Sequence, residues 1–233
     1  MPKIVVSEEK RRRRRPTRSG TVLSEQLIVE TALRLLREHG SAGLTARRLG
    51  LALDCDPSAL YRYFRGMDEL TLAIGDTLIG QALRGWSPSG DWRDDLRTLG
   101  RRIHGAYVAH PQAAVLTASR VTGRANELAA DEAVLSVLRG AGLPVRDVVA
   151  VYHAFIDQTL AFAALDAASL ALPNAALRSD EEMWQSTYRR VPATTHPHIA
   201  EVAPLLAPEM VASAYPKALD LLLDGVAARL APR

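Results

Sequence analysis

Residues 44–70 (LTARRLGLALDCDPSALYRYFRGMDEL) carry side chains suited to contact with a nucleic acid. The guanidinium groups of Arg47 and Arg62 can each bond bidentately to guanine O6 and N7, worth roughly 1–3 kcal/mol of discrimination between bases. Hydroxyl groups suit phosphate oxygens, which fix the register of a protein on a duplex without reading its sequence. The hydroxyls of this kind in the stretch belong to Thr45, Tyr61 and Tyr63. The stretch is therefore a candidate for binding double-stranded DNA.

Two small apolar residues in the same stretch, Pro57 and Ala59, suit contact with a thymine methyl group. The alternative for both arginines, Arg47 and Arg62, is simple ion pairing on the protein surface. Cys55 is either a redox-sensing thiol or, more commonly for such a position, a packing residue.

The spacing of capping residues predicts two short helices joined by a sharp turn. Thr45 is placed to cap the first helix, and Leu44 and Leu49 form the hydrophobic pair that accompanies such a start. The arrangement repeats, because Asp56 can cap and Pro57 takes the first helical position, where its missing N–H has no partner to lose. Two capped helices this close together have helix-turn-helix spacing.

The inner and outer faces of this unit follow from the same pattern. The buried side is expected to hold Leu49, Ala52, Leu53, Leu60 and Phe64. The outer face of the second helix is left to Ser58, Ala59, Tyr61, Arg62 and Tyr63.

The rest of the chain is also predicted to be helical, with no alternating strand pattern and no internal repeat. A first helix runs from Ser24 to Gly40, and further helices are expected over 67–85, 91–110, 125–139, 144–171 and 209–230. Residues 173–207 are rich in proline, which favours short helices and loops, and Pro216 either kinks the last helix or marks its start. The fold class is all-α, with a three-helix helix-turn-helix head followed by a larger helical body for ligand binding and dimerisation.

The net charge of +3 is unevenly distributed. Residues 1–20 hold eight basic and two acidic side chains, a net +6, so the rest of the chain carries −3. Charge this dense cannot pack, and we expect a disordered basic arm there. The arm either contacts DNA in the minor groove or along the phosphates, or only keeps the protein in solution. Its candidate DNA-contacting residues are Arg11, Arg12, Arg13, Arg14 and Arg15.

Composition limits the class and location of the protein. Residues 21–66 are expected to form the DNA-binding domain, and residues 67–233 the effector-binding and dimerisation domain. By inspection, no apolar run is long enough to span a membrane, so no membrane partner is expected. The single cysteine fits a reducing compartment, which predicts the cytoplasm.

Residues 23–70 resemble the N-terminal domain of the tetracycline-repressor (TetR) family of bacterial transcriptional regulators. The resemblance covers the first helix, its glycine stop, the segment LTARRLGLAL, the turn and SALYRYFRGMDEL. The C-terminal AYPKALDLLLDGVAARL also resembles the end of the founding group of that family, in which the last helix packs in the dimer.

The resemblance implies a homodimeric repressor that binds a palindromic operator and is released when a small-molecule effector enters the body. The dimer is expected to form through helices at about 144–171 and 209–230. The DNA-facing positions that the resemblance implies are Thr45, Arg47, Pro57, Ser58, Ala59, Tyr61, Arg62 and Tyr63.

The sequence departs from the family pattern at two positions. Asp54 stands where the turn usually has glycine, and it should keep the turn at small cost because aspartate tolerates the left-handed region. Met67 stands where a lysine frequently contacts a phosphate. The arginine-rich arm is a candidate to bind phosphate in place of that lysine.

Polar and aromatic residues of the helical body are candidates to line an effector cavity. They are His104, Tyr107, Phe155, Gln158, Phe162 and Trp184. The apolar, alanine-rich body favours a hydrophobic or aromatic effector. No cofactor, metal or catalytic residue is expected, although His196 and His198 form an H-x-H pair without an identified third ligand.

Two other functions compete with a ligand-responsive regulator. An architectural DNA-binding protein without an effector would not need so large a body. An all-helical enzyme would need converging groups. The adjacent carboxylates Asp94–Asp95 and Glu181–Glu182 do not converge, because neighbours on a helix point about 100° apart. The sequence also lacks a phosphate-binding glycine loop, a nucleophile elbow and a metal-binding helix motif.

Overall fold

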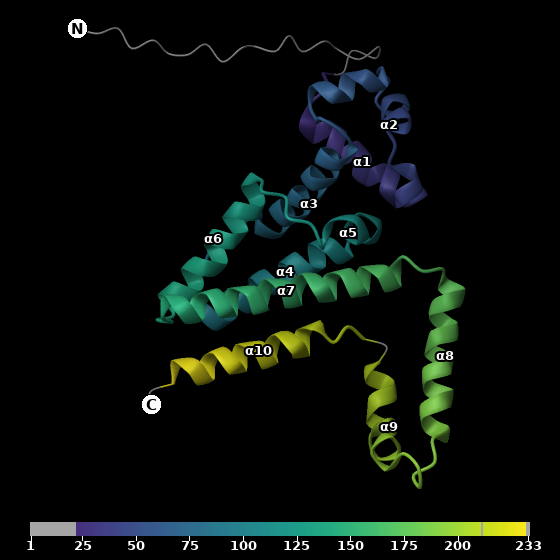
Figure 1. Ribbon diagram of the computed structural model, residues 1–233, viewed down its shortest axis with the longest axis vertical. Coiled ribbons are helices and arrows are strands. Elements are labelled where there is room, and N and C mark those ends of the chain that lie inside the picture. The colour runs from purple at the N-terminus through teal and green to yellow at the C-terminus, as the bar shows by residue number, and fades with distance from the viewer. Residues whose placement is uncertain (1–21, 211, 232–233) are drawn as a thin grey trace, which may run out of the picture.

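A computed structural model describes residues 22–210 and 212–231 of the chain (Figure 1). Those residues form helices and no strand, as the all-α prediction requires. A small head lies at one end of a larger helical body. The expected basic arm over residues 1–20, with its run of arginines at 11–15, lies outside the described residues.

The first helix of the head, α1 (Glu25–His39), begins and ends where the sequence predicts. The Ser24 hydroxyl accepts a hydrogen bond from the backbone N–H of Leu27 at 3.1 Å, which caps the helix. Gly40 ends it with a φ of 65°, a left-handed conformation that glycine adopts without steric cost. Its buried side chains include Ile28, Ala32, Leu35 and Leu36.

In the head, α1, α2 (Ala46–Ala52) and the 3₁₀ helix η2 (Pro57–Arg62) bury side chains that are continuous with the core of the body. The predicted core residues Leu49, Leu53, Leu60 and Phe64 are all buried. Ala52 is exposed, contrary to the prediction, because the end of α2 turns Leu53 toward the core instead.

The body begins with α3 (Met67–Leu83), which connects it to the head and buries Leu70, Ile74 and Leu78 as expected. Its other helices are α4 (Trp92–Val108), α5 (Pro111–Thr117), α6 (Ala125–Gly140), α7 (Val145–Leu170), α8 (Asn174–Arg190), α9 (Pro197–Glu209) and α10 (Tyr215–Leu230). The long helix α7 packs against α4, α5, α6 and α10 and is the centre of the body.

The prediction of short helices and loops over 173–207 is wrong. The segment forms two regular helices, α8 and α9, which pair with each other as a hairpin that projects from the body (Figure 1). Pro173 precedes α8 and Pro197 lies in the first turn of α9, where no helical N–H is lost. Pro204 and Pro208 lie within α9, which therefore forms without the backbone N–H of either residue.

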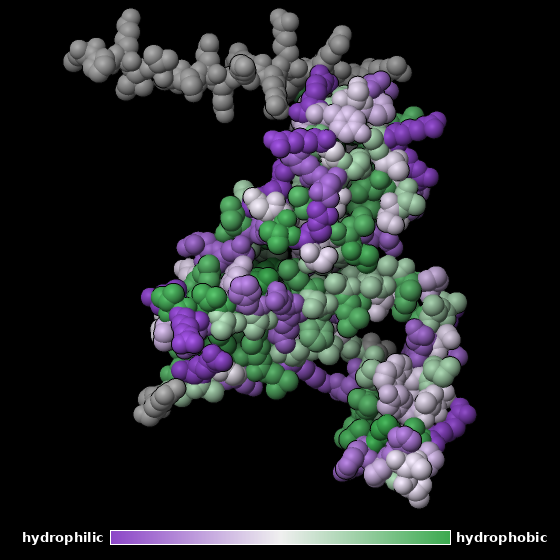
Figure 2. All heavy atoms as spheres, viewed as in Figure 1, coloured by the Kyte–Doolittle hydropathy of each residue, from purple (hydrophilic) through white to green (hydrophobic). Residues whose placement is uncertain are grey.

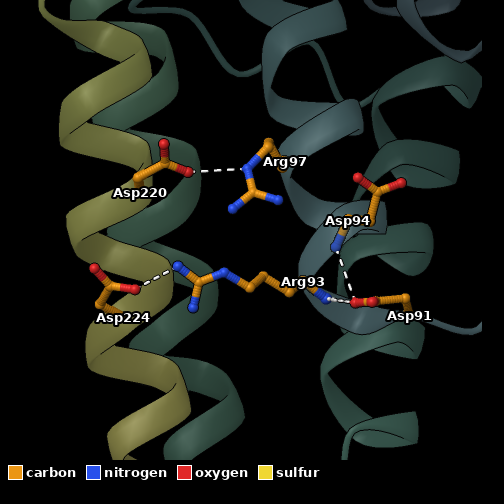
Figure 3. A network of polar contacts seen from close by, with 6 residues as sticks. All are labelled: Asp91, Arg93, Asp94, Arg97, Asp220 and Asp224. Carbon is orange, nitrogen blue, oxygen red and sulfur yellow. Dashed lines mark hydrogen bonds and ion pairs between the residues drawn. The ribbon is translucent and has the colours of Figure 1, made fainter.

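The last helix, α10, starts at Tyr215, so Pro216 marks its beginning rather than a kink. Two arginines of α4 reach across to two carboxylates of α10 (Figure 3). The Arg97 Nε lies 2.9 Å from Asp220 Oδ1, and Arg93 pairs with Asp224. The hydrogen bond from Arg97 lowers the pKa of Asp220, and these contacts hold α10 along α4.

The helix α7 corrects the expectation that no segment is long and apolar enough for a membrane. Among the described residues, α7 alone meets that test of length and composition. Its buried residues, such as Phe155 and Ala163, pack inside the protein, and Asp157 lies on its exposed side. This mixture of buried apolar and exposed polar residues is typical of a core helix in a folded protein, with its exposed side open to contact with another surface.

The loop between α5 and α6 ties the body to the head. Arg120 lies 2.9 Å from Asp68 at the start of α3, and Arg124 lies 3.1 Å from Glu25 at the start of α1. Asp76 of α3 then accepts hydrogen bonds at the start of α6 from two backbone N–H groups and one side-chain amide, at 2.9–3.0 Å. A movement of α6 would therefore be transmitted to the connector α3 through these hydrogen bonds.

Candidate nucleic-acid interface and body cavity

The first helix of the helix-turn-helix, α2, presents its start to solvent. Thr45 caps it by accepting a hydrogen bond from the backbone N–H of Arg48 at 3.2 Å, as predicted. Because the oxygen is the acceptor there, the hydroxyl hydrogen can still donate to a phosphate. The side chain of Arg47 is exposed, and so is that of Arg48, which the sequence pattern does not single out.

The turn between α2 and η2 depends on two residues. Asp54 has a φ of 51°, so aspartate does occupy the left-handed turn position. Gly50 lets the two helices approach closely, because a Cβ there would lie 2.9 Å from the Cys55 carbonyl oxygen and 3.0 Å from Pro57. The sequence could have indicated this close packing, because glycine inside a helix lowers stability and is expected mainly where two elements must approach closely.

The second helix of the unit is a 3₁₀ helix, η2, rather than an α-helix. Asp56 caps it through Oδ1, which accepts from the backbone N–H of Ser58 at 2.8 Å, and Pro57 occupies its first turn. The side chains of Ser58, Tyr61 and Arg62 are exposed. Those of Pro57 and Ala59 are half-buried, which limits how much of each could contact a base.

Tyr63 differs from its predicted place on the outer face. It is half-buried, and its hydroxyl donates a 2.7 Å hydrogen bond to the backbone carbonyl of Leu23. That donor is therefore committed inside the head, where it joins the segment before α1 to η2. In this structure the role of Tyr63 is to hold the head together rather than to donate to a phosphate.

Two neighbouring residues also have packing roles. Cys55 is half-buried, and desolvation raises the pKa of its thiol above the ordinary value, which disfavours the reactive thiolate. Met67 packs partly buried against the core of the protein. Neither contributes a charge to the exposed surface of the head.

The body contains a cavity of about 540 Å³ between α4, the end of α7, α8 and the segment before α10. In Figure 2 a hollow is visible between the α8–α9 hairpin and the rest of the body. Of the six residues predicted to line an effector cavity, the structure places His104 and Trp184 there.

The other four predicted residues do not line this cavity. Tyr107 and Phe155 are 2% and 0% exposed and belong to the core. Gln158 donates to the carbonyl of Ala218 at 3.1 Å, and Phe162 packs against Tyr215. All four lie on helix faces turned toward neighbouring helices, a property that sequence spacing on α4 and α7 does not reveal.

His104 is held at the cavity wall by two neighbours, Asp166 and Tyr215. Its Nε2 lies 2.8 Å from Asp166 Oδ2, and its ring stacks on Tyr215 with 4.4 Å between ring centroids. Ser213 also donates to Asp166. Burial raises the pKa of Tyr215 to about 12, so its hydroxyl stays protonated and can bond to Thr159 at 2.9 Å.

This network does not activate a nucleophile. Ser213 and His104 both bond to the carboxylate of Asp166, so no base lies between the serine and the acid as nucleophilic catalysis requires. The H-x-H pair of His196 and His198 was considered above as a metal site. His196 Nδ1 lies 2.9 Å from the hydroxyl of Thr195, and no group of three potential metal ligands occurs among the described residues.

Two family models match the chain. One, described as "Bacterial regulatory proteins, tetR family", matches residues 28–74, and the other, "Tetracyclin repressor-like, C-terminal domain", matches residues 85–230. The chain belongs to the TetR family. Membership of a family of regulatory proteins excludes the enzyme alternative.

Individual TetR-family relatives agree with this assignment. A possible TetR family transcriptional regulator from Streptomyces coelicolor is 30% identical with a TM-score of 0.74, over 88% of this chain and 100% of that one. BioQ of Mycobacterium smegmatis is 25% identical with a TM-score of 0.62, over 88% and 99%. An HTH-type transcriptional regulator of Saccharopolyspora erythraea is 28% identical over 58% of this chain and 57% of its own length. The match thus spans little more than half of that curated relative.

Proposed function

We propose that this TetR-family protein is a homodimeric, sequence-specific DNA-binding repressor that leaves a palindromic operator when a small-molecule effector fills the body cavity. The observation that carries the proposal is the head, in which capped α2 and η2 present Arg47, Tyr61 and Arg62 on exposed positions. BioQ, a relative by fold and sequence, has been solved with its natural double-stranded DNA operator.

The exposed residues of the head divide into two roles. Arg47 and Arg62 read guanine edges in the major groove, because a guanidinium is the side chain that bonds bidentately to O6 and N7. The hydroxyls of Thr45, Ser58 and Tyr61 donate to phosphates and set the register of the head. Pro57 and Ala59 contribute contact with a thymine methyl through the parts of their side chains that remain exposed.

Dimerisation is supported by two exposed stripes of small and apolar residues. On α7, the exposed residues Ala154, Ala161 and Leu165 recur at helical spacing and share one face. On α10, the exposed stripe comprises Leu221, Gly225 and Ala228, with Leu221 72% exposed. Small side chains let helices approach closely, so α7 and α10 of two copies can pack as a four-helix arrangement.

The body cavity favours a ligand-responsive regulator over an architectural DNA-binding protein. A drug-sized cavity of about 540 Å³ has no purpose in a protein that only bends or coats DNA. The ion pair of Arg124 with Glu25 of the head, the ion pair of Arg120 with Asp68 at the start of α3, and the hydrogen bonds of Asp76 to α6 supply a path from the body to the connector α3.

The division of labour follows the fold. We assign residues 21–66 to DNA binding, residues 67–233 to effector binding and dimerisation, and residues 1–20 to a basic arm beside the DNA. A protein with this task acts on the chromosome, which places it in the bacterial cytoplasm.

The experiment that tests the proposal is a footprint on the DNA flanking the gene of this protein. We expect one protected palindrome, bound by a dimer, and loss of protection in the variant Arg62→Ala. The matched control is Arg178→Ala, which removes an exposed arginine from α8. A monomer in solution that protects no palindrome would refute the proposal.

A further inference from the structure

The cavity beside α8 is lined by both apolar and acidic side chains. The apolar residues include Leu170, Leu177 and Met210. The acidic residues are Asp166 of α7 and Asp180 and Glu181 of α8, while no lysine or arginine is among the described residues that line it. A ligand that fills this space must therefore present an apolar surface and tolerate a negative field.

The three carboxylates are not equivalent. Asp166 is engaged through its Oδ2 atom, which accepts a hydrogen bond from Ser213 and lies 2.8 Å from His104 Nε2. Asp180 and Glu181 form no ion pair with any described lysine or arginine, and Glu181 accepts only a 3.3 Å hydrogen bond from Gln185. These two carboxylates remain available to a bound molecule.

Elsewhere in the body, some acidic side chains are paired with arginine. Asp220 and Asp224 of α10 meet Arg97 and Arg93 of α4, as Figure 3 shows. The cavity differs because no arginine is among the described residues that line it. Arg178 of α8 is exposed and does not line the cavity. Charges of one sign around a concave, partly apolar site attract the opposite charge and repel their own.

An aromatic surface lies beside these two carboxylates. Trp184 lines the cavity one helical turn beyond Asp180, and its ring stacks on Tyr188 with 4.2 Å between centroids. An indole attracts cations through its π-electrons and also packs against apolar groups. Met210, which also lines the cavity, has a flexible side chain that adapts to irregular shapes.

We propose that the effector of this protein is an organic cation with an aromatic or apolar body, held by Trp184 and neutralised by Asp180 and Glu181. The inference rests on the proposed function, because it names the chemical class of molecule that the body cavity takes. It also extends the sequence-based expectation of a hydrophobic effector by adding a positive charge. The volume of about 540 Å³ admits a single molecule of drug size.

The first test compares two probes of nearly the same size and shape but opposite charge, tetraphenylphosphonium and tetraphenylborate. Binding to the full-length protein is measured by isothermal titration calorimetry without DNA. We expect the phosphonium to bind at least about tenfold more tightly than the borate, because both probes bury similar apolar surface and differ in their Coulomb interaction with the wall. Equal affinities, or tighter binding of the borate, would overturn the assignment.

The second test locates the charge effect. In the double variant Asp180→Asn, Glu181→Gln, each carboxylate becomes an amide of the same shape, and the preference for the phosphonium should fall about tenfold. The matched control is Glu182→Gln, since Glu182 follows directly on α8 and does not line the cavity. Asp180, Glu181 and Glu182 are all exposed, so none of these changes should unfold the protein. A double variant that retains the full preference would show that the cation is held elsewhere.

Operator binding separates failure of this inference from failure of the proposed function. A protein that binds its operator without ligand but does not prefer the phosphonium remains a DNA-binding regulator, with an effector of another class. A protein that binds no operator fails as a repressor, whatever the calorimetry shows.

Discussion

The head and the α8–α9 hairpin differ in how far their helices are buried. In the head, η2 spans six residues and α2 seven, yet their residues Leu49 and Leu60 are 0% and 4% exposed in a shared core. In the hairpin, α8 spans 17 residues and buries none of its side chains. Helix length therefore says little about how firmly a segment is held, because tertiary burial supplies most of the stability of a helix.

This difference suits the two tasks. In the proposed function the head must keep Arg47 and Arg62 at a fixed spacing, so its helices need a rigid core. A cavity wall that admits a ligand must open, and elements that move are drawn from the least stable part of a fold. The hairpin is such an element, since its helices pack chiefly on each other.

The largest expected effect breaks the core of the head. Leu49→Ala should lower the free energy of unfolding by about 2–5 kcal/mol, because it removes a fully buried side chain and leaves a cavity. Leu205→Ala on α9, where the side chain is 76% exposed, should change it by less than about 0.5 kcal/mol. Urea unfolding followed by circular dichroism measures both. Similar decreases in the two variants would mean that the hairpin is as firmly packed as the head.

The next effect concerns DNA. Arg62→Ala should weaken operator binding by about 1–3 kcal/mol and relax the preference for guanine at one position in each half-site. The readout is fluorescence anisotropy with the operator and with versions changed at single base pairs. Uniform weakening on every sequence would assign Arg62 to a phosphate, and no weakening at all would remove it from the interface.

A smaller effect is expected from the charge that the chain concentrates at the head end. Deleting residues 1–18 should weaken binding on operator and unrelated DNA alike. It should also flatten the slope of log affinity against log salt by about 0.9 for each phosphate that the protein no longer neutralises. Titrations at several salt concentrations measure that slope. An unchanged slope would leave the arm with no role in binding.

The smallest effect separates α10, which is pinned to α4, from the unpinned hairpin. The pKa of Asp220 in the folded protein lies below its ordinary value of 3.8, so its pairing with Arg97 stabilises the fold above that pH and is lost as pH falls through the folded-state pKa. Asp220→Asn should therefore be less stable than the native protein at pH 7, with the difference shrinking in acid. Thermal melts from pH 3 to 7 measure it, and Asp94→Asn serves as the control on α4. A constant difference across that range would contradict the ion-pair account.

Local rules were sufficient wherever an interaction spans only a few residues. The caps by Thr45 and Asp56 reach two or three positions along the chain, and the left-handed turn at Asp54 depends on one backbone angle. The same rules left Pro216 as either a kink or the start of the last helix, and the structure shows it in the first turn of α10, where proline is tolerated.

Long-range contacts were out of reach of the same rules. The hydroxyl of Tyr63 bonds to Leu23, which lies 40 positions earlier in the chain, so no local pattern could show that this donor is occupied. The cavity shows the same limit: His104 and Trp184 line it, but Phe155 and Tyr107 are turned into the core by neighbouring helices.

The sequence by itself determined the all-α class, the helix-turn-helix with its caps and the family, and it supplied the positions that we propose contact DNA. These depend on hydrogen bonds and hydrophobic spacing within one or two helical turns. Only the tertiary structure decided that residues 174–209 fold as a hairpin and that Asp180 and Glu181 lie beside Trp184 without an arginine or lysine partner among the described residues. The reason is physical: which carboxylates meet an arginine, and which remain available to a ligand, depends on how separate helices pack and not on the chain between them.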